Sequence, residues 1–549
     1  MIETCALNSI NMAPMEAETF DYIVVGGGSA GCILAERLSA DAKTRVLVLE
    51  AGGVDRNWLL HLPIGAARVW NNPAFNWSYQ SAPEPHANGR SIYHPRGKVL
   101  GGSAAINMMA YVRGNPGDYD RWAQMGLSDW SYEKVLPYFR ACESFRGGAD
   151  DWRGGDGPIL TQRHPAADPL LDAWLEAGKA SGYSVTPDYN GRDQEGFDRF
   201  QFNIGDGRRS NSAARFLRPA LKRPNLNLAT GALVDKLGFD GMRASSVEYE
   251  VAGVKHRALV RAEIVMAAGA YNTPQILLRS GIGPADHLQS LGITPLLDRK
   301  GVGANLQDHP AVGLDYHRKR PGDLYQQIRL DRLGLNLLRA WYLRSGPATL
   351  PIASGTAFVR SAPEIDIPDI QLLMRGYSPE MGPWFPLLKS SKPDGMGVTA
   401  CHLRPQARGH LKLTSTDPHA APIFVNNFLD NEFDRRAMRN GFKIARHVMT
   451  QAAFDDVRAE ERLPGPGVRS DDEIDGYIRE SVRTVFHPCG TCRMGTDDGS
   501  VVDPQLHVRG LTNLRIADAS VMPDVVGGNI NAAVMMIALK AADYIARRR

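Results

Sequence analysis

The chain has 549 residues, 43% hydrophobic and 22% charged, which is the composition of a folded globular protein rather than a disordered or fibrous one. Its 63 lysines and arginines nearly balance 60 aspartates and glutamates, and a net charge of +3 argues against nucleic acid as a partner. Six cysteines are too few for a disulfide framework and suit a reducing compartment. At about 150 residues per domain, the length alone predicts three to four domain-sized units.

The two ends of the chain give no signal for export or membrane insertion. The N-terminal segment carries three glutamates and has neither a basic nor a strongly apolar region, so it does not have the pattern of a secretory signal. The longest apolar run, residues 532–539, is far shorter than a membrane span of about 20 residues. We therefore expect no integral membrane segment and a cytoplasmic protein, with peripheral attachment to the inner membrane left open.

The first structural pattern is a β-α-β unit over residues 20–50. An apolar run at residues 20–25 ends in two β-branched valines, and residues 45–49 form a second such run. Between the two runs, hydrophobic residues recur at helical spacing up to Ser39. A G-x-G-x-x-G sequence at residues 26–31 lies at the first turn, which is typical of dinucleotide-binding proteins.

Each glycine of this loop has an expected role. Gly26 makes the tight turn, Gly28 lets a pyrophosphate approach the backbone, and Gly31 lets the helix pack closely on the strand. The helix N-terminus directs free N–H groups at the phosphates. Glu50 follows at the separation of about 20 residues at which a carboxylate binds ribose hydroxyls. The pattern does not distinguish NAD from FAD, and a glycine-rich turn of another α/β protein is the alternative.

Beyond Glu50 the chain becomes irregular. No second β-α-β unit follows at once, as a simple nicotinamide dehydrogenase would require, so we expect an interrupted architecture. Residues 317–480 mix strands, proline-rich turns and helix, which indicates a separate layer. Other expected elements are a second glycine cluster at 95–103, a strand and turn at 263–270, an apolar helix at 275–279, an amphipathic helix near 432–451 and a final helix at 531–546.

Taken in order, these motifs resemble the glucose–methanol–choline (GMC) oxidoreductase family, in its choline-dehydrogenase-like and primary-alcohol-dehydrogenase branch. The resemblance runs from about Asp21 to the C-terminus. It rests on the Gly26–Gly31 loop with Glu50, RGKVLGGSAAINMMAYVRG at 96–114, GAYNTPQILLRSGIG at 269–283, NLQDH at 305–309, HPCGTCRMG at 487–495, VDP at 502–504, ADA at 517–519 and GNIN at 528–531.

The resemblance implies an α/β fold, in which a Rossmann-like FAD-binding domain is interleaved with a substrate domain built on an antiparallel sheet with helices. The expected FAD-binding domain is discontinuous, and the substrate domain is inserted into it. This replaces the three to four units that the length predicts. The approximate boundaries are 20–160, 205–316 and 487–549 for the FAD-binding domain, and 161–204 and 317–486 for the substrate domain.

The family resemblance also implies the oxidation of a primary alcohol to an aldehyde. His487 is expected to take the hydroxyl proton while the hydride passes to flavin N5. Asn531 is the expected partner, able to hydrogen-bond the substrate oxygen, and its alternative role is an N-cap of the final helix. Electrons are expected to pass to an acceptor such as a quinone. The alternatives are an oxidase that reduces O2 to H2O2, other flavin chemistry such as decarboxylation, an NAD-dependent enzyme and a non-catalytic FAD-binding protein.

The cofactor implied by the resemblance is FAD. Ile106 stands at the position of the histidine that links the flavin covalently in some relatives, so FAD is expected to be held non-covalently. The sequence does not identify the alcohol or the oligomeric state. The expected cofactor-binding residues are Gly26, Gly28, Ser29, Ala30, Gly31, Glu50, Ala51, Val99, Ser103, Asn107, Met108, Met109, Ala110, Val234, Phe486, Asp518, Ala519 and Asn531.

Other histidines and cysteines are expected to be structural. Cys489-Gly-Thr-Cys492 lacks two further ligands at matched spacing, so no metal site is predicted, and it lacks a thioredoxin-like context. Asp308-His309 is expected to be a hydrogen-bonded structural pair, and His402 and His410 to have no catalytic role.

Overall fold

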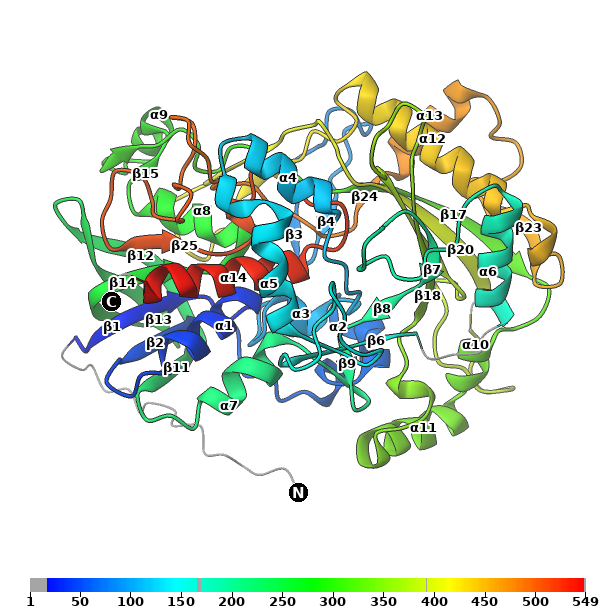
Figure 1. Ribbon diagram of the computed structural model, residues 1–549, viewed down its shortest axis with the longest axis horizontal. Coiled ribbons are helices and arrows are strands. Elements are labelled where there is room, and N and C mark those ends of the chain that lie inside the picture. The colour runs from blue at the N-terminus through cyan, green and yellow to red at the C-terminus, as the bar shows by residue number, and fades with distance from the viewer. Residues whose placement is uncertain (1–16, 165–168, 392, 548–549) are drawn as a thin grey trace.

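The computed structural model describes residues 17–164, 169–391 and 393–547, so residues 1–16 of the N-terminal segment lie outside the described part. Two seven-stranded sheets lie in the left and right parts of Figure 1. The first has the order β11-β2-β1-β14-β13-β12, with β25 paired to β14. Its strands are β1 (Thr19–Val25), β2 (Val46–Glu50), β11 (Leu226–Thr230), β12 (Ala232–Asp240), β13 (Arg243–Val251), β14 (Val254–Met266) and β25 (Leu514–Ile516).

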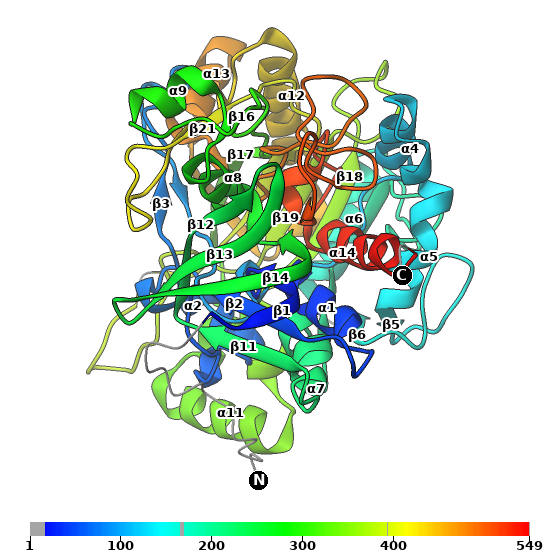
Figure 2. The ribbon, with the colours of Figure 1, turned by 90° about the vertical axis from the view of Figure 1, so that its left-hand side faces the viewer.

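The first sheet brings together segments that are far apart in the sequence. β1 pairs in parallel with β2 and with β14, and β25 adds in parallel to the end of β14. The central strands are rich in valine, leucine and isoleucine and are buried, as expected for parallel strands covered on both faces. Figure 2 shows this sheet facing the viewer, with α1 (Ser29–Leu38) and α14 (Asn531–Ala546) beside it.

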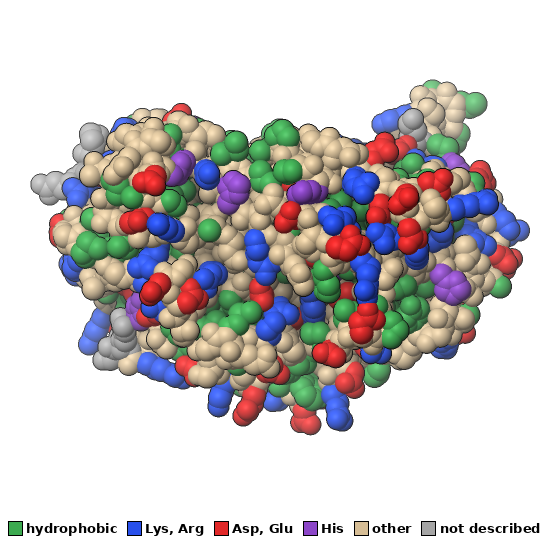
Figure 3. Space-filling view, turned by 90° about the horizontal axis from the view of Figure 1, so that it is seen from above, with side chains coloured by type: hydrophobic (Ala, Val, Ile, Leu, Met, Phe, Trp, Pro, Cys, Tyr) green, Lys and Arg blue, Asp and Glu red, His purple; other side chains and the backbone are tan. Residues whose placement is uncertain are grey.

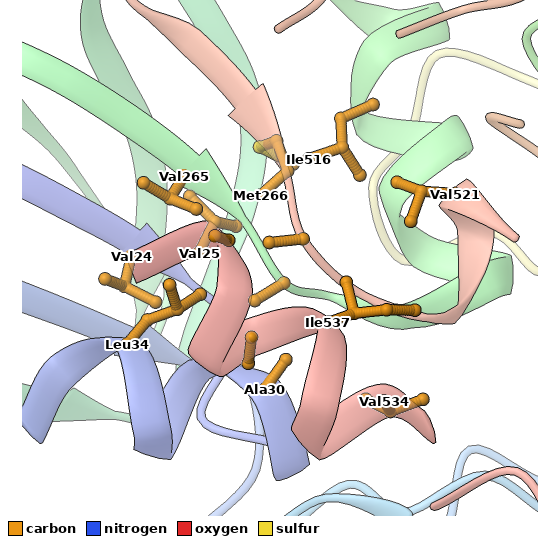
Figure 4. Close-up of a cluster of buried hydrophobic side chains, with 14 of the residues drawn as sticks. Val24, Val25, Ala30, Leu34, Val265, Met266, Ile516, Val521, Val534 and Ile537 are labelled. Carbon is orange, nitrogen blue, oxygen red and sulfur yellow. The ribbon is translucent and has the colours of Figure 1, made fainter. Parts of the chain in front are cut away.

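α14 forms much of the core behind the glycine loop. The helix is apolar almost all round its circumference and is buried over nearly its whole length, which is the property of a core helix. Figure 4 shows Ala30 of α1 on the side toward Ile537 of α14, and Leu34 of α1 beside Val24 of β1. The bounds of α14 are those predicted from the sequence, residues 531–546.

The second sheet is antiparallel and has the order β23-β17-β20-β19-β18-β7, with β24 paired to β17. The amphipathic α12 (Glu432–Met449) packs its apolar face on this sheet, and the Asn431 side chain caps it by accepting from the Asp434 N–H at 2.9 Å. The strands are β7 (Gly196–Arg199), β17 (Pro310–Arg318), β18 (Ala353–Val359), β19 (Ile370–Arg375), β20 (Gly395–His402), β23 (Arg458–Leu463) and β24 (Arg483–Thr484).

The predicted α/β fold class is confirmed, with small differences in its details. The expected boundary between residues 316 and 317 falls inside β17, and the one between 160 and 161 falls inside β6 (Ile159–Arg163). Within the described residues, no helix combines the length and the hydrophobicity that crossing a membrane requires.

One expected helix begins earlier in the structure than in the sequence pattern. The helix expected at 275–279 is α8 (Gly269–Arg279), which contains Pro274. Proline cannot donate to the carbonyl four residues before it, so it normally breaks a helix. Here the Thr491 hydroxyl donates to that carbonyl, of Ala270, at 2.6 Å. The helix continues through the proline because a distant side chain satisfies the freed oxygen.

Candidate active site

A cavity of about 1040 Å³ is lined by residues from both sheets and from the loops between them. Its size is at the upper end of ligand pockets in proteins, which are commonly about 300–1,000 Å³. The glycine loop after β1 and the start of α14 form one side. Residues of β19 and of a helical segment around 324–337 form the other side.

The glycine loop fits the close backbone approach expected of a dinucleotide site. Gly26 has a φ of +107°, and a Cβ atom on Gly31 would lie 1.8 Å from the Gly26 carbonyl oxygen. A side chain at either position is therefore excluded. The second glycine cluster docks here, because Gly101 N–H donates to Gly27 O at 2.8 Å and Gly102 approaches Gly28.

Glu50 closes the same loop at the end of β2. One carboxylate oxygen accepts from Gly27 N–H at 2.8 Å and the other from Gly52 N–H at 2.7 Å. Burial raises the pKa of this carboxyl to about 7, although both backbone hydrogen bonds act against the shift. Glu50 lines the cavity, so its carboxyl group is within reach of a hydroxylated ligand bound beside the loop.

His487 lies at the cavity wall and uses both ring nitrogens. Its Nε2 accepts a hydrogen bond from Asn529 Nδ2 at 3.0 Å, and its Nδ1 lies 3.0 Å from Nδ1 of His309. With Nε2 accepting, the neutral ring carries its proton on Nδ1 and donates it to His309. This tautomer directs the basic nitrogen of His487 toward the side on which Asn529 lines the cavity.

The backbone around His487 is fixed by Asp308 and Arg96. One carboxylate oxygen of Asp308 accepts from His487 N–H at 2.8 Å, and the other accepts from Thr484 Oγ1 at 2.6 Å. Arg96 donates to the carbonyl of Phe486 at 2.6 Å. Phe486 has a φ of +71°, a strained conformation that persists only where surrounding contacts enforce it.

The imidazole of His487 is uncharged in this environment. Burial, with a smaller contribution from the Arg96 charge, lowers the pKa of His487 to about 3. Burial and the nearby His487 ring also lower the pKa of His309 well below its usual value. Both rings are therefore uncharged near neutral pH.

Asn531 lies at the start of α14 but does not cap it. The N-cap position is Ile530, and Asn531 is the first helical residue. Its side-chain oxygen accepts from Ser29 Oγ at 2.7 Å, which joins α14 to the glycine loop. The proposed capping role is therefore wrong. The asparagine whose side chain contacts the His487 ring is Asn529, two positions earlier.

Most of the expected cofactor residues line the same cavity. Among the expected set, Gly31 and Val99 do not line it, and Gly31 instead packs against Gly26. The Asp518 carboxylate is fully engaged by Gly269 N–H, Thr273 and Ser520, so this carboxylate holds the loop that lines the cavity. The expected residues at the cavity are Gly26, Gly28, Ser29, Ala30, Glu50, Ala51, Ser103, Asn107, Met108, Met109, Ala110, Val234, Phe486, Asp518, Ala519 and Asn531.

Sequence reasoning did not identify three neighbours of His487. Arg96 opens the first family signature and Asn529 lies inside the GNIN motif, so both had a signal, but neither was assigned a role. His309 was expected to pair with Asp308, yet its ring contacts His487, and the Asp308 carboxylate accepts the backbone N–H of His309 at 2.7 Å. Only the fold brings residues 309 and 487 together.

The remaining histidine and cysteine candidates have other environments. Cys489 and Cys492 are buried free thiols, and burial raises both pKa values well above the usual range. His402 Nε2 lies 3.3 Å from Asp434 Oδ1, away from the cavity lining. No group of three or more potential metal ligands occurs in the part of the chain that the structure describes.

These features fit a bound dinucleotide. The turn of Gly26–Gly31 leaves open space above Gly28, and a buried carboxyl group lies at the end of β2. The first residues of α1 and α14, Ser29 and Asn531, both line the cavity, and a helix N-terminus favours a bound anion. The same cavity extends to the neutral His487, so a ligand bound along the loop would reach the candidate base.

Comparisons with known proteins agree with this geometry. Family profiles described as GMC oxidoreductase match residues 20–311 and 405–538. The chain is 41% identical to an oxygen-dependent choline dehydrogenase of Sinorhizobium fredii, covering 96% of this chain and 95% of the relative. A Staphylococcus saprophyticus protein of the same name is also 41% identical, with 96% and 95% covered.

Solved structures give the same result. Pyridoxine 4-oxidase from Mesorbium loti superposes with a TM-score of 0.86 at 31% identity, covering 96% of this chain and all of that chain. A formate oxidase variant from Aspergillus oryzae superposes with a TM-score of 0.89 at 26% identity, with 97% and 99% covered. The cavity, the neutral histidine and the glycine loop are arranged as these comparisons lead one to expect. The chain therefore belongs to the GMC oxidoreductase family and is an FAD-dependent oxidoreductase acting on CH–OH donors.

Proposed function

We propose that this enzyme oxidises an uncharged primary alcohol with an apolar body to the aldehyde, with His487 as the base. The observation that carries the proposal is the neutral imidazole at the cavity wall, whose Nε2 accepts a hydrogen bond from Asn529. A substrate hydroxyl in the place of that amide would deliver its proton to Nε2. Asn531 would supply an amide donor to the substrate oxygen as its charge develops.

Proteins of this family bind FAD, which supplies the hydride acceptor when it is bound. We propose that the residues of the glycine loop, Glu50 and the first turn of α14 hold it without a covalent bond. Ile106 is buried at the cavity and has no nucleophilic atom. Acid precipitation of the purified enzyme should leave the flavin in the supernatant, and flavin retained in the protein pellet would contradict this.

The substrate side of the cavity favours an apolar alcohol. Its aliphatic lining residues are Leu324, Ile328, Leu333, Leu337, Ile352, Leu373, Met374 and Met381. Among described lining residues the only carboxylates are Glu50 and Asp518, both at the glycine-loop end and both bonded to backbone N–H groups. Arg375, which is paired with Asp315, and Arg483 also line the cavity.

Choline is the second candidate, supported by the names of the relatives. Recognition of a quaternary ammonium relies on aromatic faces and is helped by negative charge. Aromatic residues such as Trp70 and Tyr377 are present in the lining, but a carboxylate on the substrate side is not among the described lining residues. The arrangement therefore supports an uncharged alcohol over a cationic one.

A direct comparison of the two substrates tests the proposal. Under anaerobic conditions, 1-octanol or benzyl alcohol should bleach the flavin absorbance faster than choline at equal concentration. Faster bleaching by choline would replace the proposed substrate class. Bleaching by no alcohol would support a non-catalytic FAD-binding protein instead.

For the second half of the cycle we propose an acceptor such as a quinone, with O2 as the alternative. Reoxidation of the reduced enzyme in air and with a soluble quinone distinguishes them, since a dehydrogenase reoxidises slowly in air and an oxidase forms H2O2 quickly. We also propose a cytoplasmic location, supported by the unpaired thiols of all five described cysteines.

A further inference from the structure

α11 (Leu330–Leu343) is a helix with hydrophobic residues on two opposite faces. It projects from the lower edge of the molecule in Figures 1 and 2, and no described helix or strand lies below it. Leu333 and Leu337 point inward and line the active-site cavity. The outward face is also apolar, although a helix at a protein surface normally directs polar residues to water.

The outward side chains are far more exposed than hydrophobic residues usually are. Leu335, Leu338, Tyr342 and Leu343 are between 56% and 75% exposed, and Leu387 and Leu388 of a neighbouring hairpin are more than 80% exposed. We call these six residues the leucine face. Monomeric soluble proteins rarely expose such residues as a group without using them for binding.

The hairpin and the helix form one continuous structure. The carbonyl of Trp384 accepts from Leu330 N–H at 2.9 Å, and the Trp384 indole donates to the carbonyl of Tyr325 at 2.9 Å while its ring stacks on Tyr325. Phe385 N–H donates to Lys389 O at 2.9 Å, which closes the hairpin. Leu387 and Leu388 lie at its tip and are tied in this way to the start of α11.

The charges around the leucine face are mostly positive. Arg332, Arg339, Arg344 and Lys389 are exposed on α11 and the hairpin. Asp331 is already paired with Arg329 at 2.7 Å. The upper face differs, because acidic and basic side chains are mixed across it in Figure 3, with ion pairs such as Arg439–Asp475 and Lys443–Asp471 on α12 and α13 (Asp471–Ser481).

We propose that the leucine face docks this enzyme onto an anionic lipid surface. Leucines and a tyrosine are flanked by arginines and a lysine that form no ion pair with any described residue. This arrangement matches the requirements of an interfacial helix, in which apolar residues enter the acyl boundary and cations bind the headgroups. A second copy of the chain is a less suitable occupant, because a symmetric contact would bring this positive charge against itself. Docking would place a wall of the active-site cavity at the lipid surface.

Flotation of the flavin-loaded enzyme with vesicles tests the proposal. We expect binding to phosphatidylcholine vesicles that contain about 30% phosphatidylglycerol, weaker binding to phosphatidylcholine alone, and weakening by salt. Leu335→Ser/Leu338→Ser and Leu387→Ser/Leu388→Ser should each lower the vesicle partition coefficient about tenfold or more. The matched control is Met242→Ser/Val254→Ser, because these residues are 41% and 45% exposed on another surface, and it should bind like the wild type.

Light scattering by the same samples completes the test. The variants should keep the mass, flavin content and alcohol reduction rate of the wild type in solution, since none of the four leucines lines the cavity. Failure of the wild type to bind either vesicle at low salt would overturn the proposal. A dimer that Leu335→Ser/Leu338→Ser dissociates would also overturn it, because a second copy would then cover the leucine face.

Discussion

His487 is oriented by contacts to its backbone as well as to its ring. Asp308 holds the backbone N–H, Arg96 holds the preceding carbonyl, and Asn529 and His309 engage the two ring nitrogens. Groups fixed in this way lose little entropy when they react, which is a major source of catalytic rate. The positive φ of Phe486 is therefore best understood as part of the positioning of the base.

The proposed role of Asn531, an amide donor to the substrate oxygen, can be tested by substitution. Asn531→Ala should lower the rate of anaerobic flavin reduction about a hundredfold, the usual cost of one oxyanion donor. The rate should be expressed per bound flavin, since Asn531 also lies in the first turn of α14, which is proposed to hold the cofactor. Asn440→Ala is the control, since Asn440 is an asparagine on α12 that bonds Ser361 O outside the cavity. A full reduction rate in Asn531→Ala, measured by stopped flow, would remove this residue from the mechanism.

The pH dependence of the free energy of unfolding tests whether buried histidines such as His94 are held neutral. Burial lowers the pKa of His94 to about 3, so between the unfolded pKa of about 6.5 and this value only the unfolded chain binds the proton. Stability is therefore lost as the pH falls through this window. From pH 7 to pH 5 the loss from this one residue is about 2 kcal/mol.

His94→Gln removes this titration. Glu50 and Asp308 have raised pKa values and act in the opposite direction, so the difference between wild type and variant must be compared rather than the wild-type profile alone. Denaturant unfolding at the two pH values should show a smaller loss in His94→Gln. Equal losses in both proteins would mean that His94 is not held neutral.

At the scale of the elements, the glycine loop and α14 define the site together. The Ser29–Asn531 hydrogen bond links the first β-α-β unit to the last helix across 502 residues of sequence. α14 is apolar and buried along nearly its whole length, so packing holds the helix in place. Because the helix is held, the position of its N-terminus at the cavity is also fixed. Packing of α14 and binding at its first turn are therefore coupled.

Gly31→Ala tests whether close packing of the loop is required for cofactor binding. The added methyl group would meet Gly26 O at 1.8 Å, and the loop would have to move. We expect most of the flavin to be lost on purification, measured by absorbance against protein. Gly467→Ala is the control, because no atom beyond its chain neighbours lies within 4 Å of the place that a methyl group would occupy there. Normal flavin content in Gly31→Ala would show that the loop tolerates displacement.

The sequence predicted local elements better than long-range contacts. The first β-α-β unit, α12 and α14 follow from hydrophobic periodicity, which depends on neighbouring residues alone. The early start of α8 was not predictable, because its proline is compensated by Thr491 from a distant segment. The contacts of the His487 ring with His309 and with Asn529 also depend on segments that only the fold brings together.

At the scale of the whole molecule, the order of the motifs predicted the domain organisation better than the length of the chain did. A division every 150 residues would cut the first sheet, whose strands come from residues 19–50, 226–266 and 514–516. The alternation of family motifs along the chain predicted interleaving, and the sheet order is consistent with it. The near-neutral net charge also gives no sign of how unevenly charge is distributed. Exposed arginines and a lysine flank the leucine face, whereas α12 and α13 carry paired charges.

The central claim is that His487 acts as the base in alcohol oxidation. Its most direct test is anaerobic stopped-flow reduction of the wild type and of His487→Ala by 1-octanol. We predict that both proteins retain flavin, and that the variant is reduced about a thousandfold or more slowly, since a positioned base contributes about 10²–10⁴-fold. Reduction of His487→Ala at the wild-type rate would contradict this role.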